Sequence, residues 1–171
     1  MLAASDAPLV LEDGRQVWLR PLDRRDGYAL MALRRRLSDE TVRRRFLRYS
    51  PPCAVRDAFK LADVDQQQRV AIAAVPAPNA IEPILAVARF HVNVGDRAEL
   101  ALLVEDAYQH VGLGRQLLAA LFSVAHGRAL RSLYGYTLYG NDPALRLLRG
   151  CGHALRIGWH GGDVLEVELD V

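Results

Sequence analysis

The fold is decided by one short stretch of the chain, residues 105–115, which reads EDAYQHVGLGR. A predicted strand ends where this stretch starts, a loop with two glycines follows, and an amphipathic helix begins near Gly112. The first turn of a helix has unpaired backbone N–H groups and the positive end of the helix dipole. Glycines at 112 and 114 let an anion approach these groups closely. The stretch therefore predicts a cradle for a phosphate or pyrophosphate; the alternative is a helix that packs tightly on a sheet.

Regular elements extend from this stretch in both directions. The helix over 112–127 carries a single apolar stripe, made by Leu113, Leu117, Leu118, Leu121 and Phe122. Ser38 is the expected cap of an earlier helix, and Gly95-Asp96 marks a turn between two strands. The predicted order is strand 16–22, helices 26–37, 38–50 and 55–63, strands 69–75, 83–94 and 97–105, helix 112–127, strand 132–139, helix 141–151, and strands 153–159 and 164–171.

This order indicates the fold class. Short loops join the three central strands, so we expect an antiparallel meander there, with crossover helices in the later part of the chain. The prediction is an α/β protein with a mixed, mostly antiparallel sheet flanked by helices.

Two other phosphate-binding loops are excluded. The dinucleotide fingerprint GxGxxG fails because Leu117 stands where the third glycine belongs, and no acidic residue follows at the end of a second parallel strand. The GxxxxGK[ST] pattern is absent.

Composition limits the class of protein further. The 171 residues are 51% hydrophobic and 25% charged, the balance of one ordinary globular domain. The formal net charge of +2, from 22 basic and 20 acidic residues, gives no strong field for nucleic acid or an anionic membrane. No apolar run reaches the ~18 residues of a membrane span. Residues 1–8 lack the pattern of a signal peptide.

The cysteines and histidines point to no metal or disulfide. Cys53 and Cys151 lie far apart and form no CxxC pattern, which predicts free thiols in a reducing, cytoplasmic compartment. The 5 histidines show neither HxxxH nor HxH spacing, so we expect no metal site. The basic runs 34–36 and 43–45 predict a solvated helix face, with recognition of an acidic partner surface as the alternative.

Two motifs resemble those of one enzyme family. Residues 109–114 (QHVGLG) resemble the [QR]-x-x-G-x-[GA] loop of the GNAT superfamily of N-acetyltransferases, and residues 141–144 (NDPA), with Gly152-His153, resemble its second motif. The element order is similar to the GNAT fold over residues 14–171, which we interpret as one GNAT domain after a lead-in of residues 1–13. Residues 37–51 (LSDETVRRRFLRYSP) further resemble the start of the GNAT domains found in bacterial protein-lysine acetyltransferases.

The resemblance implies a site for acetyl-CoA, the acyl-donor substrate. The molecule would lie in a cleft where the strand ending at Val104 splays from strand 132–139, with its pantetheine against that strand end and its pyrophosphate on the loop. The residues implied to bind it are Leu102, Leu103, Val104, Gln109, His110, Val111, Gly112, Leu113, Gly114, Arg115, Asn141, Ala144 and Leu148.

The resemblance also implies direct attack of an amine on the thioester, without an acyl-enzyme. Glu99 is the candidate base; its alternative role is a solvated carboxylate at a sheet edge. The family's tyrosine position in the second motif is Leu148, which cannot donate a proton. Tyr136 and Tyr139 are the candidates to replace that acid, and core packing is their alternative role.

The function implied is acetyl-CoA-dependent N-acetyl transfer to a primary amine, either a protein lysine or a small molecule. The alternative is a non-catalytic domain that binds acetyl-CoA as a sensor, which the missing tyrosine favours. Family members commonly form homodimers, so a homodimer is an expected partner besides the amine acceptor. We expect neither nucleic acid nor membrane as a partner.

Overall fold

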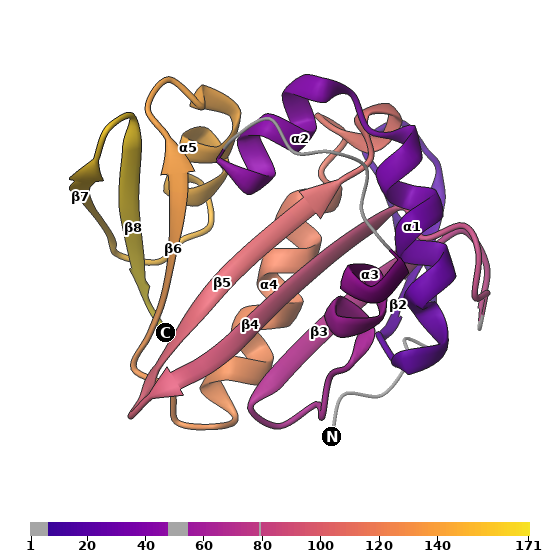
Figure 1. The fold of residues 1–171 in the computed structure, drawn as a ribbon, viewed down its shortest axis with the longest axis horizontal. Helices are drawn as coiled ribbons and strands as arrows, with labels where there is room; N and C mark the ends of the chain where they lie inside the picture. Colours follow the sequence, from indigo (N-terminus) through magenta and orange to yellow (C-terminus); the bar gives the residue numbers. More distant parts are fainter. Residues whose placement is uncertain (1–6, 48–54, 79) are drawn as a thin grey trace.

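The chain forms one sheet of 8 strands in the order β1-β2-β3-β4-β5-β6-β8-β7 (Figure 1). The computed structural model describes residues 7–47, 55–78 and 80–171. The strands are β1 Leu9–Val10, β2 Gln16–Pro21, β3 Arg69–Val75, β4 Ala86–Val94, β5 Arg97–Val104, β6 Ser132–Leu138, β7 Leu155–Gly161 and β8 Val164–Asp170. The helices are η1 Arg24–Asp26, α1 Gly27–Arg36, α2 Asp39–Phe46, α3 Val55–Ala62, η2 Asp106–Tyr108, α4 Leu113–His126 and α5 Asp142–Arg149. The predicted mixed sheet flanked by helices is confirmed.

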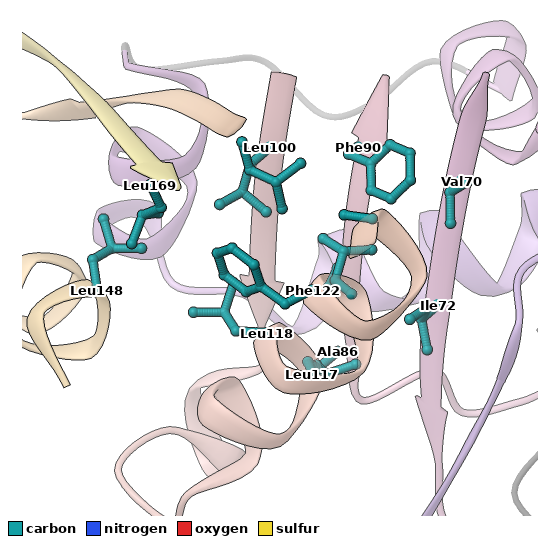
Figure 2. Close-up of a cluster of buried hydrophobic side chains, with 14 of the residues drawn as sticks. Val70, Ile72, Ala86, Phe90, Leu100, Leu117, Leu118, Phe122, Leu148 and Leu169 are labelled. Carbon is teal, nitrogen blue, oxygen red and sulfur yellow. The ribbon is translucent and has the colours of Figure 1, made fainter. Parts of the chain in front are cut away.

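Helices cover both faces of the sheet. The apolar stripe of α4 packs on one face, where Leu117, Leu118 and Phe122 join a large cluster of buried side chains (Figure 2). A second cluster on the other face joins α1 and α2 to β3, through residues such as Leu33 and Val42. Because burying one leucine side chain stabilises a fold by about 1.5–3 kcal/mol, these two clusters hold the layers together.

The sheet opens between β5 and β6. These two strands pair in parallel over only three residue pairs, from Arg97↔Ser132 to Glu99↔Tyr134. Beyond that point β6 continues to pair with β8 as far as Leu138↔Val164, while β5 continues along β4 (Figure 1). The two strand ends therefore diverge and leave a wedge-shaped opening in the sheet.

Several boundaries differ from the sequence prediction. The strand predicted from residue 83 starts at Ala86, after Pro83, which has no backbone N–H for a ladder. The strand β1 was not predicted, because two residues are too few to show a periodicity. It pairs with β2, and Leu11, the residue that follows it in the chain, is buried. The predicted helix cap at Ser38 is present, with its hydroxyl accepting from the Thr41 N–H. Residues 48–50 of that predicted helix and Cys53 lie outside the described residues.

Candidate functional site in the cleft between β5 and β6

Two adjoining cavities occupy the opening between β5 and β6. The larger cavity, of about 500 Å³, lies beside the glycine loop, and the smaller cavity, of about 160 Å³, lies beside Glu99 and Tyr136. Six residues line both: Arg44, Arg45, Leu102, Asn141, Ala144 and Leu147. The two cavities therefore form one continuous cleft. The larger one alone has the size of a small-molecule site.

The glycine loop joins β5 to α4 and lines the larger cavity. Gly112 caps α4 with a φ of +85°, a conformation that favours glycine, and no side chain caps the helix. A Cβ atom on Gly114 would lie 3.2 Å from Leu147 and 3.5 Å from Leu102. Gly114 therefore serves close packing between α4, α5 and β5, as the alternative interpretation expects. The phosphate cradle at the first turn of α4 stays a prediction.

A carboxylate lies against this loop. The Glu12 backbone N–H donates to the Val111 carbonyl at 3.1 Å, which fixes the segment after β1 beside the loop. The Glu12 Oε1 atom lies 3.6 Å from the Arg115 guanidinium, and 3.0 Å from where a Cβ atom on Gly112 would be. The sequence analysis missed Glu12 because it assigned residues 1–13 no contact with the loop.

Hydrogen bonds attach the loop to α2. Asp106 accepts from the Ser38 N–H at 3.0 Å, the Ser38 hydroxyl at 2.6 Å and the Thr41 hydroxyl at 2.8 Å. Partial burial acts to raise the pKa of the Asp106 carboxyl, but these hydrogen bonds outweigh it, and the pKa is lowered. The Gln109 amide donates to the Thr41 hydroxyl and to the Val104 carbonyl. Helix α2 is therefore held over the open end of the cleft.

The arginines of α2 face the cleft instead of forming only a solvated surface. Arg44 and Arg45 line both cavities, and Arg44 pairs with Glu40 at 2.7 Å. Arg43, on the neighbouring position, pairs with Glu40 and with Asp163 of the β7–β8 turn. The sequence could not show that these arginines lie at the cleft, because helical periodicity does not indicate against which other element the polar face of a helix packs.

The smaller cavity contains two of the predicted reactive residues. Glu99 of β5 and Tyr136 of β6 both line it, and Glu99 is exposed to solvent. The Asn93 amide donates to the Tyr134 hydroxyl at 2.8 Å and approaches the Glu99 carboxylate at 3.5 Å. Burial, with the nearby Glu166 carboxylate, raises the pKa of the Tyr136 hydroxyl.

Tyr139 is not brought to the cleft. Its side chain is 70% exposed beyond the end of β6 and packs on Trp159, at 6.0 Å between ring centres. Side chains on a strand alternate between faces, so the alternation of tyrosines could not show which of them meets the cleft. Leu148 lines the smaller cavity and not the larger one that was expected to hold the cofactor.

Most residues predicted to bind the cofactor line the larger cavity. They are Leu102, Leu103, Val104, Gln109, His110, Gly112, Gly114, Arg115, Asn141 and Ala144. The side chains of Leu113 and Val111 instead pack in and against the core below α4. The Asn141 side chain is used within the fold: its amide donates to the Thr137 hydroxyl and its oxygen accepts from the Ala144 N–H, which caps α5.

Neither a metal cluster nor a membrane helix occurs in the described parts of the chain. Within residues 7–47, 55–78 and 80–171, no group of three or more His, Cys, Asp or Glu side chains is arranged to hold a metal ion. The same residues contain no helix that is long and apolar enough to span a bilayer.

Comparisons with known proteins agree on one family. The sequence profile of the acetyltransferase (GNAT) family matches residues 38–153. An acetyltransferase of Pseudomonas aeruginosa is 30% identical over 125 residues, which are 72% of this chain and 67% of that protein.

Solved structures show the same fold. The GNAT domain of PAT from S. lividans superimposes with a TM-score of 0.86 and 26% identity, over 96% of both chains. A cAMP-binding acyltransferase from Mycobacterium smegmatis superimposes with a TM-score of 0.65 and 24% identity. This chain spans 48% of that protein's length, so the likeness shows the fold of its matching part alone.

Proposed function

The chain belongs to the GNAT family of acetyltransferases, and from this premise we propose that it transfers the acetyl group of acetyl-CoA to a primary amine. The observation that carries the proposal is the continuous cleft between β5 and β6. It has a glycine loop and a helix N-terminus at one end, and a carboxylate and a tyrosine at the other. A protein lysine and a small-molecule amine are both acceptors of this kind.

The larger cavity is the proposed site of the acyl donor. Gly112, Gly114 and Arg115 at the start of α4 line this cavity, and the unpaired N–H groups of a first helical turn suit a pyrophosphate. The diverging end of β5, residues 102–104, offers backbone to the pantetheine. This placement directs the thioester along the cleft toward the smaller cavity, where Glu99 and Tyr136 lie.

The proposed reaction is a direct displacement. Glu99 takes a proton from the ammonium form of the acceptor, directly or through a water molecule, because a protonated amine cannot attack. The amine nitrogen then bonds to the thioester carbonyl carbon, the C–S bond breaks, and CoA leaves as a thiolate. The thiolate takes up a proton from Tyr136 or from water, and the second proton of the attacking nitrogen passes to the Tyr136 phenolate or to solvent, so that the products are the neutral amide and the CoA thiol. The Tyr136 phenol is protonated at neutral pH, but its raised pKa makes it a weaker proton donor, so the acid role rests on its place in the smaller cavity.

A second candidate function is an acetyl-CoA sensor without catalysis. Leu148 favours it, because an aliphatic side chain lines the smaller cavity where the family's second motif has a tyrosine. A sensor of this kind would bind CoA in the larger cavity and release no thiol with any amine.

One experiment separates the two candidates. CoA affinity is measured by calorimetry, and thiol release from acetyl-CoA is measured with a panel of amines that includes lysine peptides and small molecules. Binding with amine-dependent thiol release supports the transferase. Binding without release from any amine supports the sensor, and absence of CoA binding removes both.

A further inference from the structure

We propose that the acceptor is a free amino acid, and that Arg45 recognises its carboxylate while Glu99 serves its amine. This inference deepens the proposed function and rests on it. It starts from the juxtaposition of the two residues: Arg45 of α2 and Glu99 of β5 line the same small cavity from opposite elements. The cavity of about 160 Å³ is smaller than the roughly 300 Å³ of the smallest usual ligand pockets. A molecule that fills it therefore contacts both residues.

The charges around this cavity are unequal. Glu99 is the one carboxylate among its lining residues in the described part of the chain, whereas Arg44 and Arg45 both line it. Arg44 already has a carboxylate partner, since its guanidinium lies 2.7 Å from Glu40. Glu99 is the one carboxylate of the described residues whose charge acts on Arg45, and Arg89 of β4 adds a further positive charge nearby.

Arg45 is a half-buried cation. Burial and the charge of Arg89 lower the pKa of Arg45 to about 10, and Glu99 opposes this shift. A guanidinium with this pKa remains charged at neutral pH, and a charge that is partly withdrawn from water favours a partner of opposite charge. Two further arginines have partners of their own. Arg89 donates to the Leu61 carbonyl, and the Arg69 guanidinium lies 3.7 Å from the Asp63 carboxylate and 3.6 Å from the Asp65 carboxylate.

An acceptor carboxylate completes this arrangement. Arginine binds a carboxylate through two parallel charge-assisted hydrogen bonds. If that carboxylate came from Glu99, the base would be engaged with a cation instead of with the amine. A carboxylate on the acceptor pairs with Arg45 and leaves Glu99 for the proton of the amine. Both reactive groups of the acceptor are then held in one orientation.

The size of the cavity favours a free amino acid over a protein lysine. In an α-amino acid the amine and the carboxylate are attached to one carbon, so both fit into one small cavity. A lysine ammonium stands on a four-carbon stem, so the nearest carboxylates belong to other side chains of the substrate protein.

The test compares amino acids with their amides. Acetylation of the common amino acids and of the corresponding amino-acid amides is measured with the unmodified protein at saturating acetyl-CoA. The amide keeps the side chain and loses the negative charge, and because its amine is less basic, the rates are compared per concentration of free amine. We expect at least one amino acid with a kcat/KM more than tenfold above that of its amide. Equal rates for acids and amides, or acetylation of lysine peptides alone, would overturn the inference.

Variants of Arg45 test whether this residue causes the preference for amino acids over their amides. Arg45→Gln should lower kcat/KM for the amino acid more than tenfold, mainly through KM, and leave the amide unchanged. Arg45→Lys should keep part of the preference. Because Arg45 also lines the larger cavity, each variant is compared on acid and amide at saturating acetyl-CoA, and Arg24→Gln, an exposed arginine on η1, should leave all values unchanged.

The outcomes separate this inference from the function on which it rests. A retained acid preference in Arg45→Gln would overturn the role of Arg45. If amines without a carboxylate are acetylated as fast as the amino acids, the proposed transferase function stands. The proposal that the acceptor is a free amino acid is then wrong. Absence of both CoA binding and acetylation would remove the proposed function itself.

Discussion

Gly135 of β6 packs directly against the backbone of Leu100 in β5: a Cβ atom at position 135 would lie 2.8 Å from the Leu100 carbonyl oxygen. This contact comes one residue beyond Glu99↔Tyr134, the last pair between the two strands. Both residues line the smaller cavity. The close approach of two backbones therefore marks the point where the sheet opens and the cleft begins.

Replacing this glycine should destabilise the fold. In Gly135→Ala the added methyl group meets a backbone oxygen that cannot rotate away, so we expect a loss of about 1–3 kcal/mol in the free energy of unfolding. Urea denaturation measures the change. Gly158→Ala is the matched control, because that strand glycine has no neighbour within 4 Å of the new atom. Equal stability of the two variants would contradict the close contact.

Glu99→Gln tests the base. The amide cannot accept the proton of the ammonium, so turnover should fall on the order of 10²–10⁴-fold. CoA affinity should stay unchanged, since Glu99 lines the smaller cavity and not the larger one. Raising the pH should restore part of the rate, because a larger share of the acceptor is then free amine. Normal turnover of the variant at neutral pH would assign Glu99 to the solvated edge of the sheet.

Gly114→Asp tests the phosphate cradle. The new side chain points toward Leu147, a flexible neighbour at 3.2 Å, and places a negative charge in the first turn of α4. CoA binding should weaken more than tenfold, or about 1.4 kcal/mol. Gly114→Asn adds nearly the same volume without the charge and should bind CoA more tightly than Gly114→Asp. Calorimetry measures the CoA affinity of both folded variants. Equal affinities would show that the negative charge does not weaken CoA binding.

Glu12→Gln should strengthen CoA binding. The Glu12 carboxylate pairs with Arg115 beside the loop, where it repels the phosphates and competes for the guanidinium. We expect a gain in affinity of roughly threefold or more at low salt, which shrinks as salt screens the exposed charges. Asp13→Asn makes the same change in charge at the next position, which does not line the larger cavity, and should have a smaller effect. A weaker affinity in Glu12→Gln would show that the carboxylate supports the loop.

Asp106 makes the contact between the loop and α2 pH-dependent. Because its pKa is lower in the folded protein, the carboxylate stabilises the fold above its ordinary pKa of about 3.9, and this stabilisation is lost as pH falls through the folded-state value. Asp106→Asn should therefore be less stable than the parent protein at pH 7, by roughly 1 kcal/mol. The difference should shrink in acid. Urea denaturation at both pH values measures it, with the exposed Asp57→Asn as control; a difference independent of pH would contradict the assignment.

Features that depend on near neighbours in the chain could be predicted from the amino-acid sequence. The apolar stripe from Leu113 to Phe122 predicted α4 because helical periodicity is local, and Ser38 and Asn141 mark helix starts through contacts within three residues. The glycine loop was predictable because Gly112 and the helix that follows it are adjacent in sequence. The resemblance to a family then indicated the fold, which the structural comparison confirms.

Only the tertiary structure decided which distant residues meet. Glu12, Arg45 and Gly135 come from three elements far apart in the sequence, and no local pattern marks any of them as part of the cleft. The alternation along β6 could not separate Tyr136, which lines the cleft, from Tyr139, which lies outside it on Trp159. The physical reason is that propensity and periodicity act over a few residues. The position of a charge relative to a cavity depends on how helices and strands pack against one another.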